Sequence, residues 1–404
     1  MARRMLLHVV LTAVLLLCTA RSNDAAITTA TVTPASLRAG AQGDVTVTIA
    51  SDVTLDVGAS IVVAFPTGFQ LSSSASTVSV SSSTSTTLSL SSITTSTATL
   101  SIGTQAIASG DALSFVLSNV LNPGATTTDA FSVTTLDSSG STIDNKSDIA
   151  GVTLVSSTLS TASVVPDSLD AGAFGTATVS FTSSVQLPVG SEITVTFPSD
   201  FVVASAALSS LSNVDTSSTL TLLSSTTVRV TVAGSAVAAS ASVSFKVNNV
   251  RNPGATTTGT FSVATTDSSG NTFESKTDIT GVTLASTTLT IDSLVPDKTL
   301  AGVSVSLTLQ FALAMDLPSG WRLRLTTPSS IVVLAGVRLV DTTAAIDVVG
   351  TIADQVVDFT LPSLYSSGSH TVQISSFRNP GEPFYQLMDV IVRFRDFFVV
   401  VVAD

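Results

Sequence analysis

Two sets of three acidic residues are the candidate metal ligands of this sequence. The spacings are 7 and 4 residues in both sets, which are Asp137, Asp144, Asp148 and Asp267, Glu274, Asp278. Carboxylate oxygens are preferred ligands of Ca²⁺, so each set could hold a Ca²⁺ ion where one domain meets the next. The alternative is a hairpin turn with solvated carboxylates, because Asp-x-x-Gly is common turn chemistry. The spacing does not match an EF-hand loop, and we favour the turns.

The other residue types argue against most catalytic and metal chemistry. Cys18 is the only cysteine, and His8 and His370 are the only histidines. His8 lies in the N-terminal leader described below, so the mature chain cannot build a catalytic triad or a zinc site from histidines. No phosphate loop or nucleophile elbow is present. Paired carboxylates brought together from distant segments are the one catalytic alternative left open. We therefore expect no enzyme and no cofactor other than Ca²⁺.

Two short motifs indicate turns and a modification. Asn145-Lys146-Ser147 is an N-glycosylation acceptor, and we expect it in a turn of a secreted glycoprotein. An Asn-Pro-Gly motif occurs three times, and its proline and glycine predict a type II turn with positive φ at the glycine. These structural turns comprise Asn122, Pro123, Gly124, then Asn252, Pro253, Gly254, and then Asn379, Pro380, Gly381.

The Asn-Pro-Gly motifs belong to a longer repeat. Pro34, Pro166 and Pro296 each open a unit and stand 132 and 130 residues apart. That period is too long for a solenoid repeat and is the size of a whole domain. We predict β-sandwich domains at 27–155 and 156–285, and a degenerate or truncated one at 286–404. The joins contain no charge run and no Gly/Pro-rich linker, which indicates a stiff rod.

Inside each unit, apolar residues alternate with serine and threonine. In the segment 305–311, for example, Val305, Leu307, Leu309 and Phe311 alternate with Ser306, Thr308 and Gln310. This period of two is typical of strands with one buried and one solvated face. We predict an all-β fold of three tandem immunoglobulin-like antiparallel β-sandwich domains. The Ser/Thr-rich segment from Leu71 to Leu100 keeps the same spacing, so we favour strands there over a disordered stalk.

The first residues have the layout of a secretory signal peptide. Arg3 and Arg4 precede an apolar run from Met5 to about Ala20, which is short for a membrane span of roughly 20 residues. Cleavage is expected after Ala20, with Ala25-Ala26 as the rival site, and we assign residues 1–26 to the leader. An uncleaved membrane anchor is the alternative.

Charge limits the partners. The net charge of −12 becomes −14 once the two arginines of the leader are removed. Such an acidic chain repels phosphate backbones and anionic lipids, so we expect no nucleic-acid partner and no membrane insertion after signal removal. Only 11% of the residues are charged, and serine and threonine supply most of the polarity.

With its Phe-Pro landmarks at Phe65-Pro66 and Phe197-Pro198 and its Asn-Pro-Gly corners, the chain resembles the tandem immunoglobulin-like repeats of large secreted surface proteins. The resemblance covers about residues 27–380 and implies an adhesin, coat or wall component, located extracellularly or at the cell surface. We expect a structural or adhesive rod. The alternative is a module that binds an extracellular protein or glycan, or associates with itself, through loops or an exposed strand edge.

Overall fold

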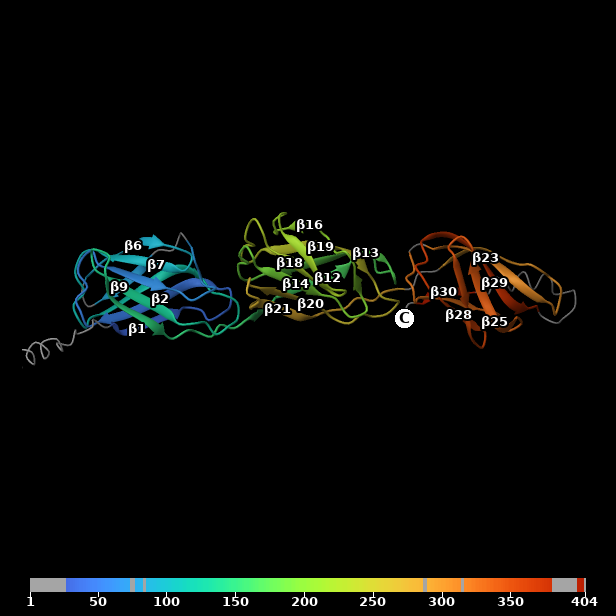
Figure 1. Ribbon diagram of the computed structural model, residues 1–404, viewed down its shortest axis with the longest axis horizontal. Coiled ribbons are helices and arrows are strands. Elements are labelled where there is room, and N and C mark those ends of the chain that lie inside the picture. The colour runs from blue at the N-terminus through green and yellow to red at the C-terminus, as the bar shows by residue number, and fades with distance from the viewer. Residues whose placement is uncertain are drawn as a thin grey trace, which may run out of the picture.

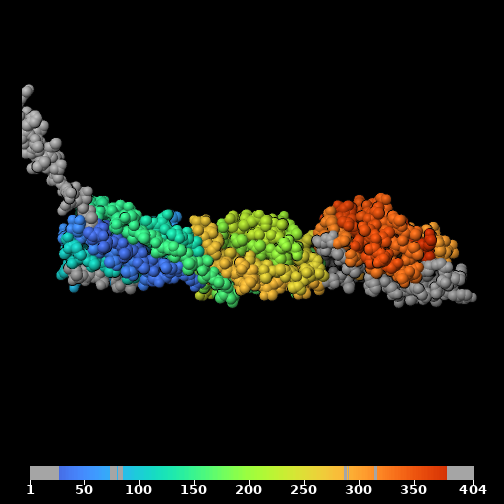
Figure 2. Space-filling model, turned by 90° about the horizontal axis from the view of Figure 1, so that it is seen from below, coloured from blue at the N-terminus to red at the C-terminus, as the bar shows by residue number. Residues whose placement is uncertain are grey.

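The computed structural model describes residues 27–72, 77–82, 85–285, 289–313, 316–379 and 398–402. These residues form six sheets and three hydrophobic clusters, with no helix among them. Consequently, no helix in the described ranges is long and apolar enough to cross a membrane. Figure 1 shows three sandwiches following one another along the long axis, and the space-filling view in Figure 2 shows the same three in a row. The predicted all-β sandwich fold is confirmed, whereas the predicted leader lies outside the described residues.

The first sandwich has the strand order of an immunoglobulin constant domain with an added hairpin. In that fold, the sheets have the orders A-B-E-D and G-F-C. One sheet here consists of β1 (Ile27–Pro34), β2 (Gln42–Ser51), β8 (Ala112–Leu121) and β4 (Gln70–Leu71), with β5 (Thr77–Ser82) also paired to β8. The other consists of β10 (Thr142–Ile149), β9 (Phe131–Leu136), β3 (Ser60–Ala64), β7 (Thr97–Ile102) and β6 (Leu88–Ile93). Strands β5, β6 and β7 lie in the Ser/Thr-rich segment, as expected.

The second sandwich repeats this arrangement. Its first sheet consists of β12 (Thr161–Pro166), β13 (Phe174–Thr182), β19 (Ser242–Arg251) and β15 (Val202–Val203), with β16 (Leu208–Ser212) also paired to β19. Its second sheet consists of β11 (Ser157–Thr158), β21 (Thr272–Ile279), β20 (Phe261–Thr266), β14 (Glu192–Thr196), β18 (Thr227–Thr231) and β17 (Thr219–Ser224). Strand β11 runs parallel to β21.

The third sandwich departs from the repeat at one edge. One sheet consists of β22 (Thr290–Pro296), β23 (Ser304–Leu313), β29 (Gly368–Arg378), β25 (Val332–Asp341) and β26 (Ile346–Val349). The other consists of β27 (Thr351–Ala353), β28 (Val356–Thr360), β24 (Arg322–Thr326) and β30 (Phe398–Val402). Strand β30 pairs with β24 just as β9 pairs with β3 and β20 with β14. The apolar segment 398–402 therefore takes the place of the sixth strand of the fold.

Alternating burial explains why these segments are strands. Along β23, Val305, Leu307, Leu309 and Phe311 are buried in the third core, and the polar residues between them face outward. Phe65 of the first Phe-Pro landmark packs against Phe69 and Phe131 with ring centroids 5.6 Å away. Edge-to-face and tilted aromatic contacts of this kind add to the stabilisation gained by burial.

The Asn-Pro-Gly corners are built differently from the predicted type II turn. Neither Gly124 nor Gly254 has a positive φ. The asparagine holds the corner instead: the buried Asn122 side chain donates to the carbonyl oxygens of Ser36 (2.8 Å) and Arg38 (3.0 Å). Asn252 and Asn379 make the matching pairs of bonds in their own sandwiches. Pro380 and Gly381 lie outside the described residues.

Candidate functional site: the joint between the first two sandwiches

A buried ion pair connects the first two sandwiches. Arg38 lies in the β1–β2 loop of the first sandwich, and Glu274 lies on β21 of the second. Their side chains approach to 2.7 Å between Nη2 and Oε1. The Glu274 side chain is fully buried, whereas the Arg38 side chain is 38% exposed. A buried carboxylate is tolerated when a cation and further donors satisfy it.

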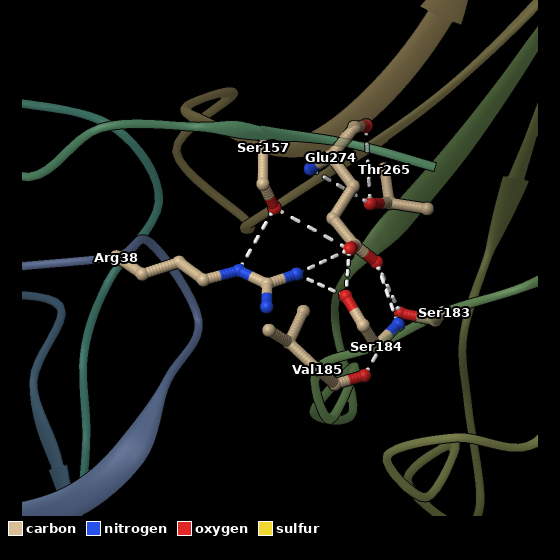
Figure 3. A network of polar contacts seen from close by, with 7 residues as sticks. All are labelled: Arg38, Ser157, Ser183, Ser184, Val185, Thr265 and Glu274. Atoms are coloured by element: carbon tan, nitrogen blue, oxygen red, sulfur yellow. Dashed lines mark hydrogen bonds and ion pairs between the residues drawn. The ribbon is translucent and has the colours of Figure 1, made fainter. Parts of the chain in front are cut away.

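Serine residues supply those further donors, as Figure 3 shows. The backbone nitrogen of Ser184 and the hydroxyl of Ser183 approach Glu274 Oε2 at 3.0 Å and 2.8 Å. The hydroxyl of Ser184 also donates to Oε1. On the other side, Arg38 Nε donates to the hydroxyl of Ser157 at 2.9 Å. Both carboxylate oxygens therefore accept several bonds, and the guanidinium is held in one orientation.

Apolar groups of the first sandwich complete the core of the second. Ala39 is fully buried within the second hydrophobic cluster, and Ala125 packs against it. Gly40 lies so close that a Cβ there would be 2.8 Å from Phe273 Cδ1 and 2.9 Å from Val185 Cγ2. At this joint, buried residues of the first sandwich therefore extend into the core of the second, while the first sandwich keeps a separate core of its own.

The two turn motifs of the repeat meet across the joint. Gly124 N, in the first Asn-Pro-Gly corner, donates to Asp267 Oδ2 at 3.0 Å. Ala125 N donates to the carbonyl oxygen of Thr272 at 2.8 Å. A Cβ on Gly124 would lie 2.2 Å from the carbonyl oxygen of Asn271, so glycine is required there for space. A small groove beside this contact is lined by residues of both sandwiches, including Gly68, Pro123, Pro188 and Asp267.

The six predicted Ca²⁺ candidates have protein partners. Asp137 and Asp267 each accept backbone hydrogen bonds within their own turns. The hydroxyl of Ser139 and the backbone nitrogen of Ser141 lower the pKa of Asp137. Asp148 and Asp278 form ion pairs with Lys146 and Lys276, and Asp144 accepts a hydrogen bond from the backbone nitrogen of Ile27. Within the described ranges, no three His, Cys, Asp or Glu side chains form a group that could hold a metal ion.

We expect Ca²⁺ to leave the stability of the chain unchanged. Protein donors already occupy these carboxylates, and a ligand stabilises a fold only if it binds the native state. Calorimetric melting in millimolar Ca²⁺ and in excess chelator should therefore give midpoints that agree within about 1 °C. A rise in the melting midpoint with Ca²⁺ concentration would contradict this expectation and favour the predicted Ca²⁺ site between the domains.

Among the described residues, no ion pair like that of Arg38 and Glu274 forms at the second joint. Asp170 stands in the second sandwich where Arg38 stands in the first, four residues after the opening proline in each case. The backbone bridge is kept, because Arg38 pairs with Val155 and Asp170 pairs with Ala285 in the same parallel manner. The side-chain contact here runs from Arg251 Nη1 to the carbonyl oxygen of Asp316 at 3.4 Å. Among the described residues, the first joint thus has the stronger side-chain contact of the two.

Arg38 was absent from the residues singled out in the sequence. Its partner Glu274 was predicted, but as a Ca²⁺ ligand rather than as half of an ion pair. The repeat did contain a signal: the aligned positions hold Arg38, Asp170 and Leu300, three unlike residues in an otherwise regular unit. Such variation at a fixed position is what a contact specific to one joint would produce.

A second polar cluster lies inside the third sandwich. His370, the one histidine after the predicted leader, is buried on β29. Its Nδ1 lies 3.0 Å from Asp341 Oδ2, and its Nε2 lies 2.8 Å from the carbonyl oxygen of Ser366. Tyr365 donates its hydroxyl to the same Asp341 oxygen at 2.7 Å. These groups lie in the core around Phe311, where the rings of Tyr365 and His370 pack against one another with their centroids 4.1 Å apart.

The glycosylation candidate lies on a strand and not in a turn. Asn145 belongs to β10, where its side chain is exposed and accepts a hydrogen bond from Thr134. Strand β10 is the outer strand of its sheet among the described residues, so the acceptor triplet is open to solvent. Glycosylation stays a prediction.

No protein-family model and no curated protein matches the chain. Among solved structures, it is similar to the B domain of a biofilm associated protein, with 10% identity and a TM-score of 0.21 over 63% of this chain and 84% of that one. It is also similar to the type II cohesin dyad of the adaptor ScaA scaffoldin of Acetivibrio cellulolyticus, with 11% identity and a TM-score of 0.17 over 61% and 93%. A marsupial T cell receptor matches with 9% identity and a TM-score of 0.20 over 86% and 93%. With TM-scores this low, nothing about the function of the chain follows from these similarities.

Proposed function

We propose that the protein is a secreted or cell-surface structural or adhesive rod whose units are held at fixed angles. The observation that carries the proposal is the joint, where Ala39 of the first sandwich is buried in the core of the second. Interfaces between independent domains are usually more polar and permit relative motion. A joint with a buried apolar contact and a buried carboxylate paired to Arg38 resists bending, which suits a mechanical role rather than a catalytic one.

The outward faces support an extracellular role. Along β7 and β13, partly exposed serine and threonine residues alternate with buried apolar residues, so hydroxyl groups make up most of the outward face of these strands. Such faces stay hydrated without a high charge density, and their hydroxyls are acceptors for O-glycosylation. A rod with these faces would hold a surface or a partner at a set distance.

Small-angle X-ray scattering on the mature chain tests the rod. We expect the wild-type data to fit one extended conformation, and Gly40→Val to broaden the distribution of angles, because its side chain would collide with Phe273 and Val185. Gly302→Val is the matched control. Gly302 stands at the equivalent position of the third sandwich with φ +71° against +68° for Gly40, but a Cβ there meets nothing within 4 Å.

Scattering from the wild type that requires many bent conformations would contradict the rod. Scattering from Gly40→Val that is identical to the control would show that the close packing of Gly40 against Phe273 and Val185 does not set the angle. A glycan array with the same chain separates a spacer from the alternative binding module, because strong and selective binding would favour the module.

A further inference from the structure

The first sandwich has an acidic residue, Asp144, at the position equivalent to Glu274, which pairs with Arg38 in the second sandwich. Asp144 on β10 and Glu274 on β21 are equivalent, and they stand 130 residues apart. In the second sandwich the carboxylate binds a cation of the preceding sandwich. In the first sandwich the carboxylate of Asp144 instead accepts a hydrogen bond from the backbone nitrogen of Ile27, 117 residues away in sequence.

Ile27 is anchored firmly at this place. Its side chain is 6% exposed and belongs to the first core cluster. It is also the first residue of β1 and pairs with Ser51 of β2. The equivalent residue of the second sandwich, Leu159, is equally buried, but its nitrogen donates to the backbone carbonyl oxygen of Ser275. The bond to a carboxylate is therefore particular to the first sandwich.

The charge at this nitrogen depends on how the chain is processed. Inside a peptide bond, the nitrogen of Ile27 carries one hydrogen and no charge, so it meets Asp144 only as a neutral donor. As a chain terminus, it would be an ammonium group with three donors and a positive charge, because an α-amino group has a pKa near 8. The residue just before it is Ala26, and signal peptidases cut after a small residue, although Asp24 stands at the other position that is small in an A-x-A site.

We propose that the chain is cleaved between Ala26 and Ile27 and that the new α-ammonium group of Ile27 forms an ion pair with Asp144. Peptidase-catalysed hydrolysis adds one water across the peptide bond. Ala26 keeps the new carboxylate, and the amine of Ile27 takes up a proton. The ion pair fixes the start of β1 and gives Asp144 the cation that Arg38 supplies to Glu274. The cleavage rests on the secretion assumed in the proposed function, whereas the ion pair does not.

Mass spectrometry of the chain secreted from a eukaryotic host tests the cleavage. We expect the mature N-terminus at Ile27, with a free amine. A mature chain that begins at Arg21 or at any residue other than Ile27 would overturn the cleavage.

A cycle of four purified chains tests the ion pair without secretion. Full chains beginning at Ile27 or at Arg21 are released from a fusion partner, each with Asp144 or with Asp144→Asn. We expect Asp144→Asn to lower the folding equilibrium constant of the first sandwich about tenfold in the Ile27 chain and less than about threefold in the Arg21 chain. Asp148→Asn, which removes an exposed carboxylate on the same strand, should act equally in both. Equal effects of Asp144→Asn in the two chains would overturn the ion pair and leave the rod proposal untouched.

Discussion

Replacing Arg38 with methionine is expected to lower the free energy of unfolding of the second sandwich by about 2–3 kcal/mol. The substitution leaves the carboxylate of Glu274 fully buried without its cation. Removing one partner of a fully buried pair costs about 3–5 kcal/mol, and the loss here is smaller because Arg38 is partly exposed and the serine donors stay in place. Hydrogen exchange of peptides from β20 and β21 measures the effect within the full chain.

Two further variants make this result specific. Adding Glu274→Met to Arg38→Met removes the buried carboxylate that has lost its cation, so most of the lost stability should return. Arg229→Met is the control, because Arg229 pairs with Glu192 at 3.2 Å on the partly exposed outer face of the same sandwich. An exposed pair contributes at most about 1 kcal/mol. If the double variant were no more stable than Arg38→Met, the buried charge would not be the cause.

Replacing Asp341 with alanine is expected to destabilise the third sandwich by about 3–5 kcal/mol. The Asp341 side chain is buried and accepts hydrogen bonds from Tyr365 and from the backbone nitrogens of Thr343 and Ala344, and it lies against His370. Alanine would leave these groups buried without an acceptor. Trp321 is the only tryptophan and packs against this core, so its fluorescence during urea unfolding reports on this sandwich alone.

Acidification should act through the same carboxylate. Burial alone would raise the pKa of Asp341, but hydrogen bonds from Ala344, Tyr365 and His370 lower it further than burial raises it. The folded pKa is therefore below the unfolded one. The resulting stability is complete above about pH 4 and is lost as the pH falls through the folded pKa.

For the Asp341→Ala substitution, the matched control is Asp347→Ala, which removes an exposed partner of Arg338 and should change the urea midpoint little. An Asp341→Ala midpoint equal to that of the control would contradict the buried cluster.

The strands follow from the sequence because the signal is local. Alternation of apolar and polar residues over five to seven positions specifies a strand and its buried face. This signal does not depend on which segment of the chain supplies the neighbouring strand. The opening prolines and the repeat spacing also indicated where each unit begins. The position of β30 in the third sandwich could not be predicted in this way, because nothing local indicates that 398–402 pairs with β24.

The joint was decided only by the tertiary structure. Arg38 and Glu274 are 236 residues apart, and neither has a local pattern that indicates an ion pair. The same holds for Asn122, whose amide binds a loop 84 to 86 residues away, so the corner was attributed to its proline and glycine instead. Short-range periodicity reports which face of a strand is buried. The partner that a buried charge or amide will meet depends on how distant segments pack, and that information appears only once the chain is folded.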